Sequence, residues 1–110
     1  MMRRARRGRA GWMALVFALA LGACSGQDRI TAAERGRQVY QSYCTSCHAT
    51  DPSQNGSLGP AVKGSSPELL EARILRGAYP LGYAPKRPSA IMQPLPNLAP
   101  NLSDLAAYLR

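Results

Sequence analysis

Histidine, cysteine and acidic residues are all scarce in this chain of 110 residues, which has one histidine, three cysteines and six Asp plus Glu. A structural zinc site needs about four ligands. Outside the stretch Cys44–His48 there is one further cysteine, Cys24, and no further histidine, so the composition argues against zinc. A long apolar run is missing too: Trp12–Leu21 has about ten residues, whereas a membrane-spanning helix needs ~20.

The shortage of acidic residues is uneven along the chain. Five arginines precede Trp12, and no acid precedes Asp28. Residues 24–110 hold nine basic and six acidic residues, so most of the formal charge of +8 lies in the first part of the sequence. We expect that part to be removed, so the basic excess does not predict a nucleic-acid-binding protein. The remaining excess is enough only for weak steering toward an acidic partner.

An arginine-rich start followed by a short apolar run is typical of an export signal. The run closes with Leu21-Gly22-Ala23-Cys24, which resembles the lipobox of bacterial lipoproteins. The resemblance implies a signal peptide over 1–23, cleavage before Cys24, and a diacylglycerol thioether on the Cys24 sulfur. Residues 24–30 would then be a polar tether. The alternative is an ordinary secretory signal cut near Ala23, which leaves Cys24 as a free thiol.

A lipidated Cys24 predicts an exported protein that faces the periplasm and is held on a membrane by two or more acyl chains. Ser25 follows this cysteine, in place of the aspartate associated with inner-membrane retention in enteric bacteria. This weakly favours the outer membrane, although the sorting rule varies between lineages.

The most informative stretch is Cys44-Thr45-Ser46-Cys47-His48, which has the Cys-x-x-Cys-His spacing of a c-type haem attachment site. Two cysteines three residues apart project to the same side of a helical turn, so both can form thioethers to one porphyrin edge. His48 can then bind the iron as proximal ligand. The alternative is a thioredoxin-like redox motif, which follows a strand in a βαβ unit, and the sequence predicts no such unit.

Capping patterns predict the helices. Thr31 and Glu34 form a capping box for a helix from Ala32 to about Ser46. Ser65 as N-cap, with Glu68 at the third position, begins a second helix that ends near Gly77. The apolar residues predicted to face the core are Ala32, Gly36, Val39, Tyr40 and Tyr43 in the first helix, and Leu69, Leu70, Ile74 and Leu75 in the second. Residues 49–64 and 78–99 are rich in turn formers and predict loops.

Gly36-Arg37-Gln38-Val39-Tyr40 followed by the Cys44–His48 motif resembles the N-terminal helix and haem site of class I cytochrome c. The resemblance covers nearly all of residues 31–110. It implies one all-α domain with a small cytochrome c fold: about three helices, with long loops wrapped around one covalently attached haem. In that family the first-helix glycine crosses a C-terminal helix that bears an aromatic residue, and residues 102–110 supply the matching helix. Because glycine destabilises a helix, its presence at position 36 also suggests that another backbone approaches closely; the alternative is an exposed glycine that is merely tolerated.

The resemblance also suggests residues around the iron. Leu58-Gly59-Pro60 resembles the family's Gly-Pro step, in which the Pro60 carbonyl accepts a hydrogen bond from the Nδ1–H of His48. Met92 is the only methionine after Met13, and the resemblance implies that it is the second iron ligand. Gln93 stands between Met92 and Pro94, which departs from the family's usual Met-Pro. A buried, gap-filling methionine is the alternative, in which case Lys63, Lys86 or an open position would stand in its place.

Together these features predict an electron carrier that is not an enzyme and that passes single electrons between redox protein partners. Its cofactor would be one haem c, held by Cys44 and Cys47 and ligated by His48 and Met92. Two alternatives stay open: a haem-bearing subunit of a larger oxidoreductase, and a sensor or enzyme whose iron has an open distal position. Tyr79, Tyr83, Lys86 and Arg87 could bind the haem propionates or could be solvated loop residues.

Overall fold

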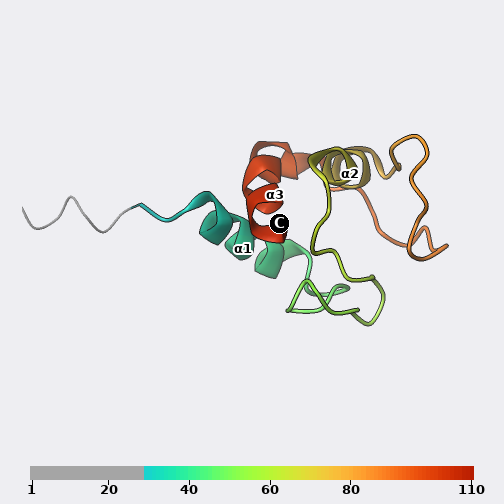
Figure 1. Cartoon of the computed structure of the whole chain (residues 1–110), viewed down its shortest axis with the longest axis horizontal. Coiled ribbons are helices and arrows are strands. Elements are labelled where there is room, and N and C mark those ends of the chain that lie inside the picture. The colour runs from blue at the N-terminus through green and yellow to red at the C-terminus, as the bar shows by residue number, and fades with distance from the viewer. Residues whose placement is uncertain (1–28) are drawn as a thin grey trace, which may run out of the picture.

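The computed structural model describes residues 29–110, and this part of the chain is helical, with no strand. It contains three short α-helices, and Figure 1 shows the long loops that join them. The elements in chain order are α1 (Ala32–Tyr43), α2 (Pro67–Leu70), the π-helical turn η1 (Glu71–Leu75), the 3₁₀ helix η2 (Pro96–Asn101) and α3 (Leu102–Leu109). The predicted all-α fold with about three helices is confirmed. The predicted signal peptide over 1–23 and the Cys24 anchor lie outside the described residues.

The first helix begins where the capping box predicts. Thr31 has extended backbone angles, and its hydroxyl oxygen accepts a hydrogen bond of 3.1 Å from the Glu34 amide. The helix ends at Tyr43, three residues earlier than predicted, with Cys44 as its C-cap. The amides of Cys47 and His48 both donate to the Cys44 carbonyl, so the attachment motif forms a separate turn after α1.

The second helix begins one residue later than predicted. Ser66, rather than Ser65, is the N-cap of α2, and its hydroxyl oxygen accepts from the Leu69 amide. The Ser65 hydroxyl donates instead to the Val62 carbonyl at 2.6 Å, so it is not available to cap the helix. After η1 the chain turns at Gly77, which has a φ of +63° and donates its amide to the Arg73 carbonyl. The predicted end near Gly77 is therefore confirmed.

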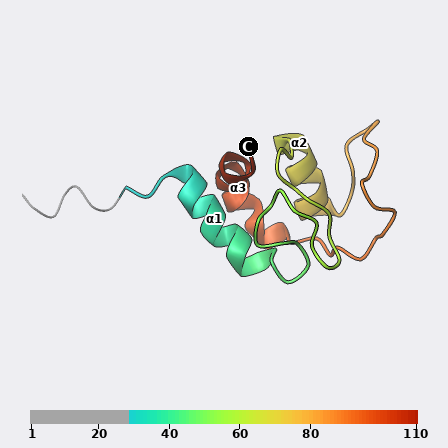
Figure 2. The same ribbon diagram turned by 60° about the horizontal axis from the view of Figure 1, so that its bottom comes forward.

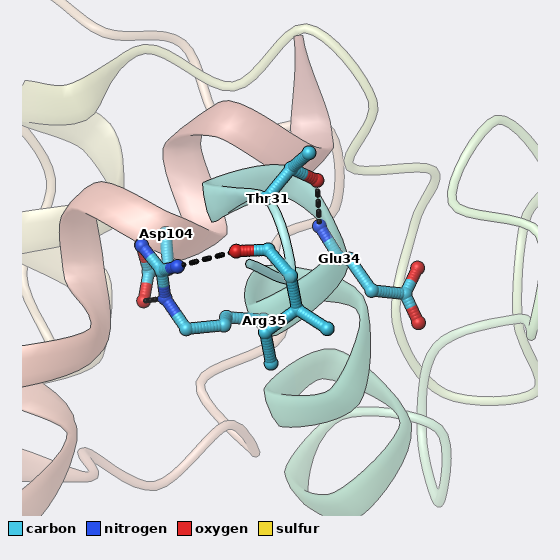
Figure 3. Close-up of polar contacts among 5 residues, drawn as sticks. Thr31, Glu34, Arg35 and Asp104 are labelled. Carbon is cyan, nitrogen blue, oxygen red and sulfur yellow. Dashed lines mark hydrogen bonds and ion pairs between the residues drawn. The ribbon is translucent and has the colours of Figure 1, made fainter. Parts of the chain in front are cut away.

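Helices α1 and α3 cross in close contact, as the two views in Figures 1 and 2 show. A Cβ at Gly36 would overlap the carbonyl oxygen of Asp104 in α3 and lie 2.9 Å from the Cβ of Tyr108. The predicted close approach of another backbone to Gly36 is thus confirmed. Beside this crossing, Arg35 reaches from α1 to Asp104 (Figure 3) and makes two hydrogen bonds of 2.9 Å to its carboxylate. A third bond, to the Ile30 carbonyl, ties the segment before α1 to the same pair.

The core lies where α1, α2, η1, η2 and α3 meet. Its fully buried members are Tyr40 and Leu105. The other large apolar residues of this cluster are Leu70, Ile74, Leu98 and Leu109. Tyr43, predicted to face the core, is 49% exposed, because it lies on the last turn of α1 and lines the cavity described below. None of the helices in residues 29–110 has the length and apolar character needed to cross a membrane.

The long loop after η1 extends away from the helices, as its orange trace shows in Figures 1 and 2. It was predicted to run without regular structure to residue 99, but η2 begins at Pro96. Two contacts hold the start and the end of this loop together. The Leu95 amide donates to the Ile74 carbonyl at 2.6 Å, and Gly77 lies beside the ring of Pro94. The two ends of the loop that carries Met92 therefore meet beside η1.

Candidate haem site

The two motif cysteines lie on the turn that follows α1, and both line one cavity. Both are half-buried and neither is in a disulfide. Burial raises the pKa of the Cys44 thiol to about 11, so this thiol is protonated at neutral pH in the polypeptide. The spacing thus brings both cysteines into the lining of one cavity.

The His48 ring is fixed by its neighbours on the following loop. Its Nδ1 lies 2.9 Å from the Pro60 carbonyl oxygen. Because a carbonyl only accepts, Nδ1 carries the proton and Nε2 keeps a free lone pair. The partner is a backbone oxygen, so the contribution of Pro60 is its restricted φ rather than its side chain. This arrangement gives His48 one unprotonated nitrogen that can bind a metal.

Glycine lets the 54–60 loop come close to the motif. A Cβ at Gly59 would lie 2.6 Å from Nδ1 of His48, and one at Gly56 would lie 2.6 Å from the His48 Cα. The amides of Leu58 and Gly59 both donate to the Cys47 carbonyl. The loop therefore packs directly on the motif, and the space beside the imidazole exists because residue 59 has no side chain.

Met92 lines the same cavity as Cys44, Cys47 and His48, although it comes from a distant part of the chain. Its side chain is half-buried and packs against the hydrophobic core. The intervening Gln93, which departs from the family pattern, also lines the cavity. The structure thus brings the four residues predicted to hold haem around one space.

The cavity has a volume of about 350 Å³ and a mostly apolar lining. Cavities of ~300–1,000 Å³ with apolar walls are typical of small-molecule and cofactor sites. The charged side chains in its lining are Arg73, Lys86 and Arg87, all cationic. A c-type haem is attached through two cysteine sulfurs and is ligated by an imidazole and a thioether, and cations suit its two carboxylates. The residues present therefore fit the cofactor.

Sequence reasoning missed the role of Tyr40 beyond its place in the core. Its hydroxyl donates a hydrogen bond of 2.6 Å to the carbonyl oxygen of Ala49, the residue after His48. Burial is the main cause that raises the Tyr40 pKa to about 12. The signal was present in the sequence, since a buried tyrosine hydroxyl needs a partner, but the partner could not be read from spacing.

The helical fold, the Cys-x-x-Cys-His turn and the apolar cavity beside it define a c-type cytochrome domain. The chain matches the family described as cytochrome c oxidase, cbb3-type, subunit III, over residues 31–109, and it belongs to that family. No curated protein and no solved structure matches it. The cofactor is a covalently attached haem c, and the domain is an electron-transfer domain whose partners are redox proteins.

Proposed function

We propose that this protein is a lipid-anchored cytochrome c that carries single electrons between redox partners at a membrane. Cys44 and Cys47 would hold the haem through thioethers, and His48 and Met92 would bind its iron. The observation that carries the proposal is the convergence of these four side chains, from two distant segments, on one apolar cavity.

Each residue has a distinct task in this proposal. The haem, when bound, supplies an iron that changes oxidation state by one electron. His48 would bind through Nε2, while its Nδ1–H is held by the Pro60 carbonyl at 2.9 Å, which orients the ring and strengthens it as a donor. The Met92 thioether is a soft ligand that favours ferrous iron and so raises the reduction potential. Two protein ligands would leave no open position for an exogenous molecule.

A second candidate function is favoured by the family itself. Its description is that of an oxidase subunit, so the protein would act as a haem-bearing subunit of a larger oxidoreductase. The local chemistry is the same in both cases, because a subunit also receives and passes on single electrons. The two differ in whether the protein exchanges partners or stays with one catalytic chain.

The membrane anchor and the location complete the proposal. Lipidation of Cys24 would hold the exported domain at a periplasm-facing membrane surface, with the outer membrane weakly favoured by Ser25. The segment up to α1 would serve as the tether. An anchored carrier moves in two dimensions, so its encounters with membrane-bound partners become more frequent.

The axial ligands are tested by visible spectroscopy of the purified holoprotein and of a Met92→Ala variant. We expect a low-spin reduced spectrum, a weak methionine-to-ferric-iron band that the variant loses, and no spectral shift with carbon monoxide. Leu81→Ala is the control, because Leu81 lies in the same loop, is fully exposed and does not line the cavity; this variant should keep the band. High-spin iron that binds carbon monoxide in the unaltered protein would favour the sensor or enzyme instead.

The carrier and subunit roles are separated by gentle detergent extraction of membranes from the native host, followed by gel filtration. A carrier elutes alone and in the same volume at low and high salt. Elution with a stoichiometric catalytic chain that persists in high salt would favour the oxidase subunit.

A further inference from the structure

Three side chains form a continuous stack beside the cavity, and the proposed iron ligation does not account for it. The guanidinium carbon of Arg73, in η1, lies 4.4 Å from the ring centroid of Tyr79. The ring of Tyr79 stacks in turn on that of Tyr83, with centroids 5.5 Å apart and planes 12° from parallel. All three residues line the cavity, and the two tyrosines belong to the loop that leads to Met92.

The guanidinium of Arg73 makes its contacts with this loop and the residues just before it. Arg73 makes no ion pair with any carboxylate among residues 29–110, whereas Arg35, Arg37 and Arg76 each have one. Besides stacking on Tyr79, its guanidinium donates a hydrogen bond of 2.9 Å to the Gly77 carbonyl. Both contacts join η1 to the first residues of the loop.

The loop has few other restraints between its ends. A turn bond from the Tyr83 amide to the Pro80 carbonyl places the two tyrosine rings on the same side of a short bend at Gly82, which has a φ of +79°. Lys86 adds one hydrogen bond, to the Ala61 carbonyl. The loop contains no helix or strand from residue 78 to residue 95. The stack connects its first part to η1, whereas Met92 and Leu95 pack against the core at its far end.

We propose that the Arg73–Tyr79–Tyr83 stack positions the Met92 loop and thereby keeps the methionine thioether at the iron. This inference rests on the proposed His48/Met92 ligation and deepens it: Arg73 is a positioning residue that acts through Tyr79. An alternative role, direct pairing of Arg73 with a haem carboxylate, would not involve the tyrosine rings.

The test uses the ferric holoprotein with Arg73→Met, Tyr79→Leu and the double variant. Arg73→Met keeps an unbranched stem but loses the planar cation, and Tyr79→Leu keeps an apolar side chain but loses the ring. Tyr79→Phe keeps the stack, and Arg76→Met removes a neighbouring exposed arginine that is paired with Glu71 outside the cavity. Both serve as controls.

Two readouts are recorded for each protein: the methionine-to-iron band and the rate of trypsin cleavage after Lys86. Arg87 is followed by a proline and is a poor trypsin site, so cleavage after Lys86 reports opening of the loop itself. A cation–π contact of this kind corresponds to about a two- to fivefold change in an opening equilibrium. We expect cleavage to rise by that factor in Arg73→Met and Tyr79→Leu, with a weaker band, while both controls behave like the unaltered protein.

The double variant decides how Arg73 acts. If it acts through Tyr79, the effect of the double variant is smaller than the product of the two single effects, because the Arg73–Tyr79 contact can be lost only once. Independent effects that multiply in the double variant would overturn the proposal and assign Arg73 to a carboxylate of the haem. Unchanged cleavage and an unchanged band in both single variants would also overturn it. Absence of the band in the unaltered protein would instead refute His48/Met92 ligation itself, and the positioning role with it.

Discussion

The hydroxyl of Tyr40 donates a hydrogen bond of 2.6 Å to the carbonyl oxygen of Ala49, the residue that directly follows His48. Tyr40 is 1% exposed and also packs against Tyr108 of α3, with ring centroids 5.5 Å apart. One side chain therefore joins the α1–α3 crossing to the backbone beside the predicted iron ligand. The stability of the helix pair and the placement of the histidine are coupled at this residue.

We expect Tyr40→Phe to lower the free energy of unfolding by about 1 kcal/mol, because the ring packing is kept and one buried hydrogen bond is lost. Urea unfolding of the holoprotein, followed by far-UV circular dichroism, measures this change. Tyr43→Phe is the control, since that side chain is 49% exposed and should change stability by only a few tenths of a kcal/mol. An equal loss in both variants would show that the Ala49 bond contributes nothing.

The raised pKa of Tyr40 predicts that the folded protein loses stability at alkaline pH. Burial raises the Tyr40 pKa to about 12, while the unfolded chain has an ordinary tyrosine pKa near ~10. Above pH ~10 the unfolded chain releases its proton while the folded chain still holds it, so stability falls as pH rises toward 12. Below pH ~10 both states are protonated and the full contribution is present.

Urea unfolding at several pH values between ~8 and ~11 tests this dependence. The unaltered protein should lose more stability over this range than Tyr40→Phe, which has no proton to release at this position. If the free energy of unfolding falls equally with pH in the two proteins, the alkaline loss of stability does not come from Tyr40.

Gly59→Ala should disturb the His48 ring without straining the backbone. The φ of Gly59 is not positive, but an added Cβ would lie 2.6 Å from Nδ1 of His48. We expect a shifted visible spectrum or a lower yield of covalent haem. The matched control is Gly64→Ala, where φ is +82° and no atom lies within 4 Å of the added Cβ. It should cost stability, ~1–2 kcal/mol, and leave the spectrum unchanged; a spectral change in both variants would point to general destabilisation.

Local signals in the sequence were sufficient to predict the helices, but not the contacts that other segments make with them. The Thr31 cap and the Gly36 contact were predicted because helix caps and close backbone contacts each favour particular residue types. The choice between Ser65 and Ser66 could not be made, since it depends on a hydrogen bond to Val62 that exists only in the folded chain. The loop contacts of Arg73 and the hydrogen-bond partner of Tyr40 could not be predicted for the same reason. Contacts between distant segments have no local pattern.

Gly36→Ala should destabilise the crossing of α1 and α3, although alanine favours helix in isolation. The added methyl group would overlap the Asp104 carbonyl, so the helices must separate. Overpacking of this kind costs roughly 1–3 kcal/mol. Gln38→Ala, an exposed position in the same helix, is the control for helix propensity. Thermal unfolding of the holoprotein measures both, and a stability for Gly36→Ala equal to that of the control would contradict a tight crossing.

Cys24 is predicted to be the first residue of the mature protein and to carry a diacylglycerol on its sulfur. A thioether-linked diacylglycerol with a further N-terminal acyl chain binds membranes stably, whereas one chain binds only marginally. Cys24→Ser should therefore release the haem-bearing domain from the membrane fraction of the native host, or leave an unprocessed precursor. Intact mass spectrometry of the unaltered protein should give the mass of residues 24–110 plus haem and acyl chains. A mass that corresponds to residues 24–110 and haem alone, with an unmodified thiol at Cys24, would mean an ordinary secretory signal and a protein without a lipid anchor.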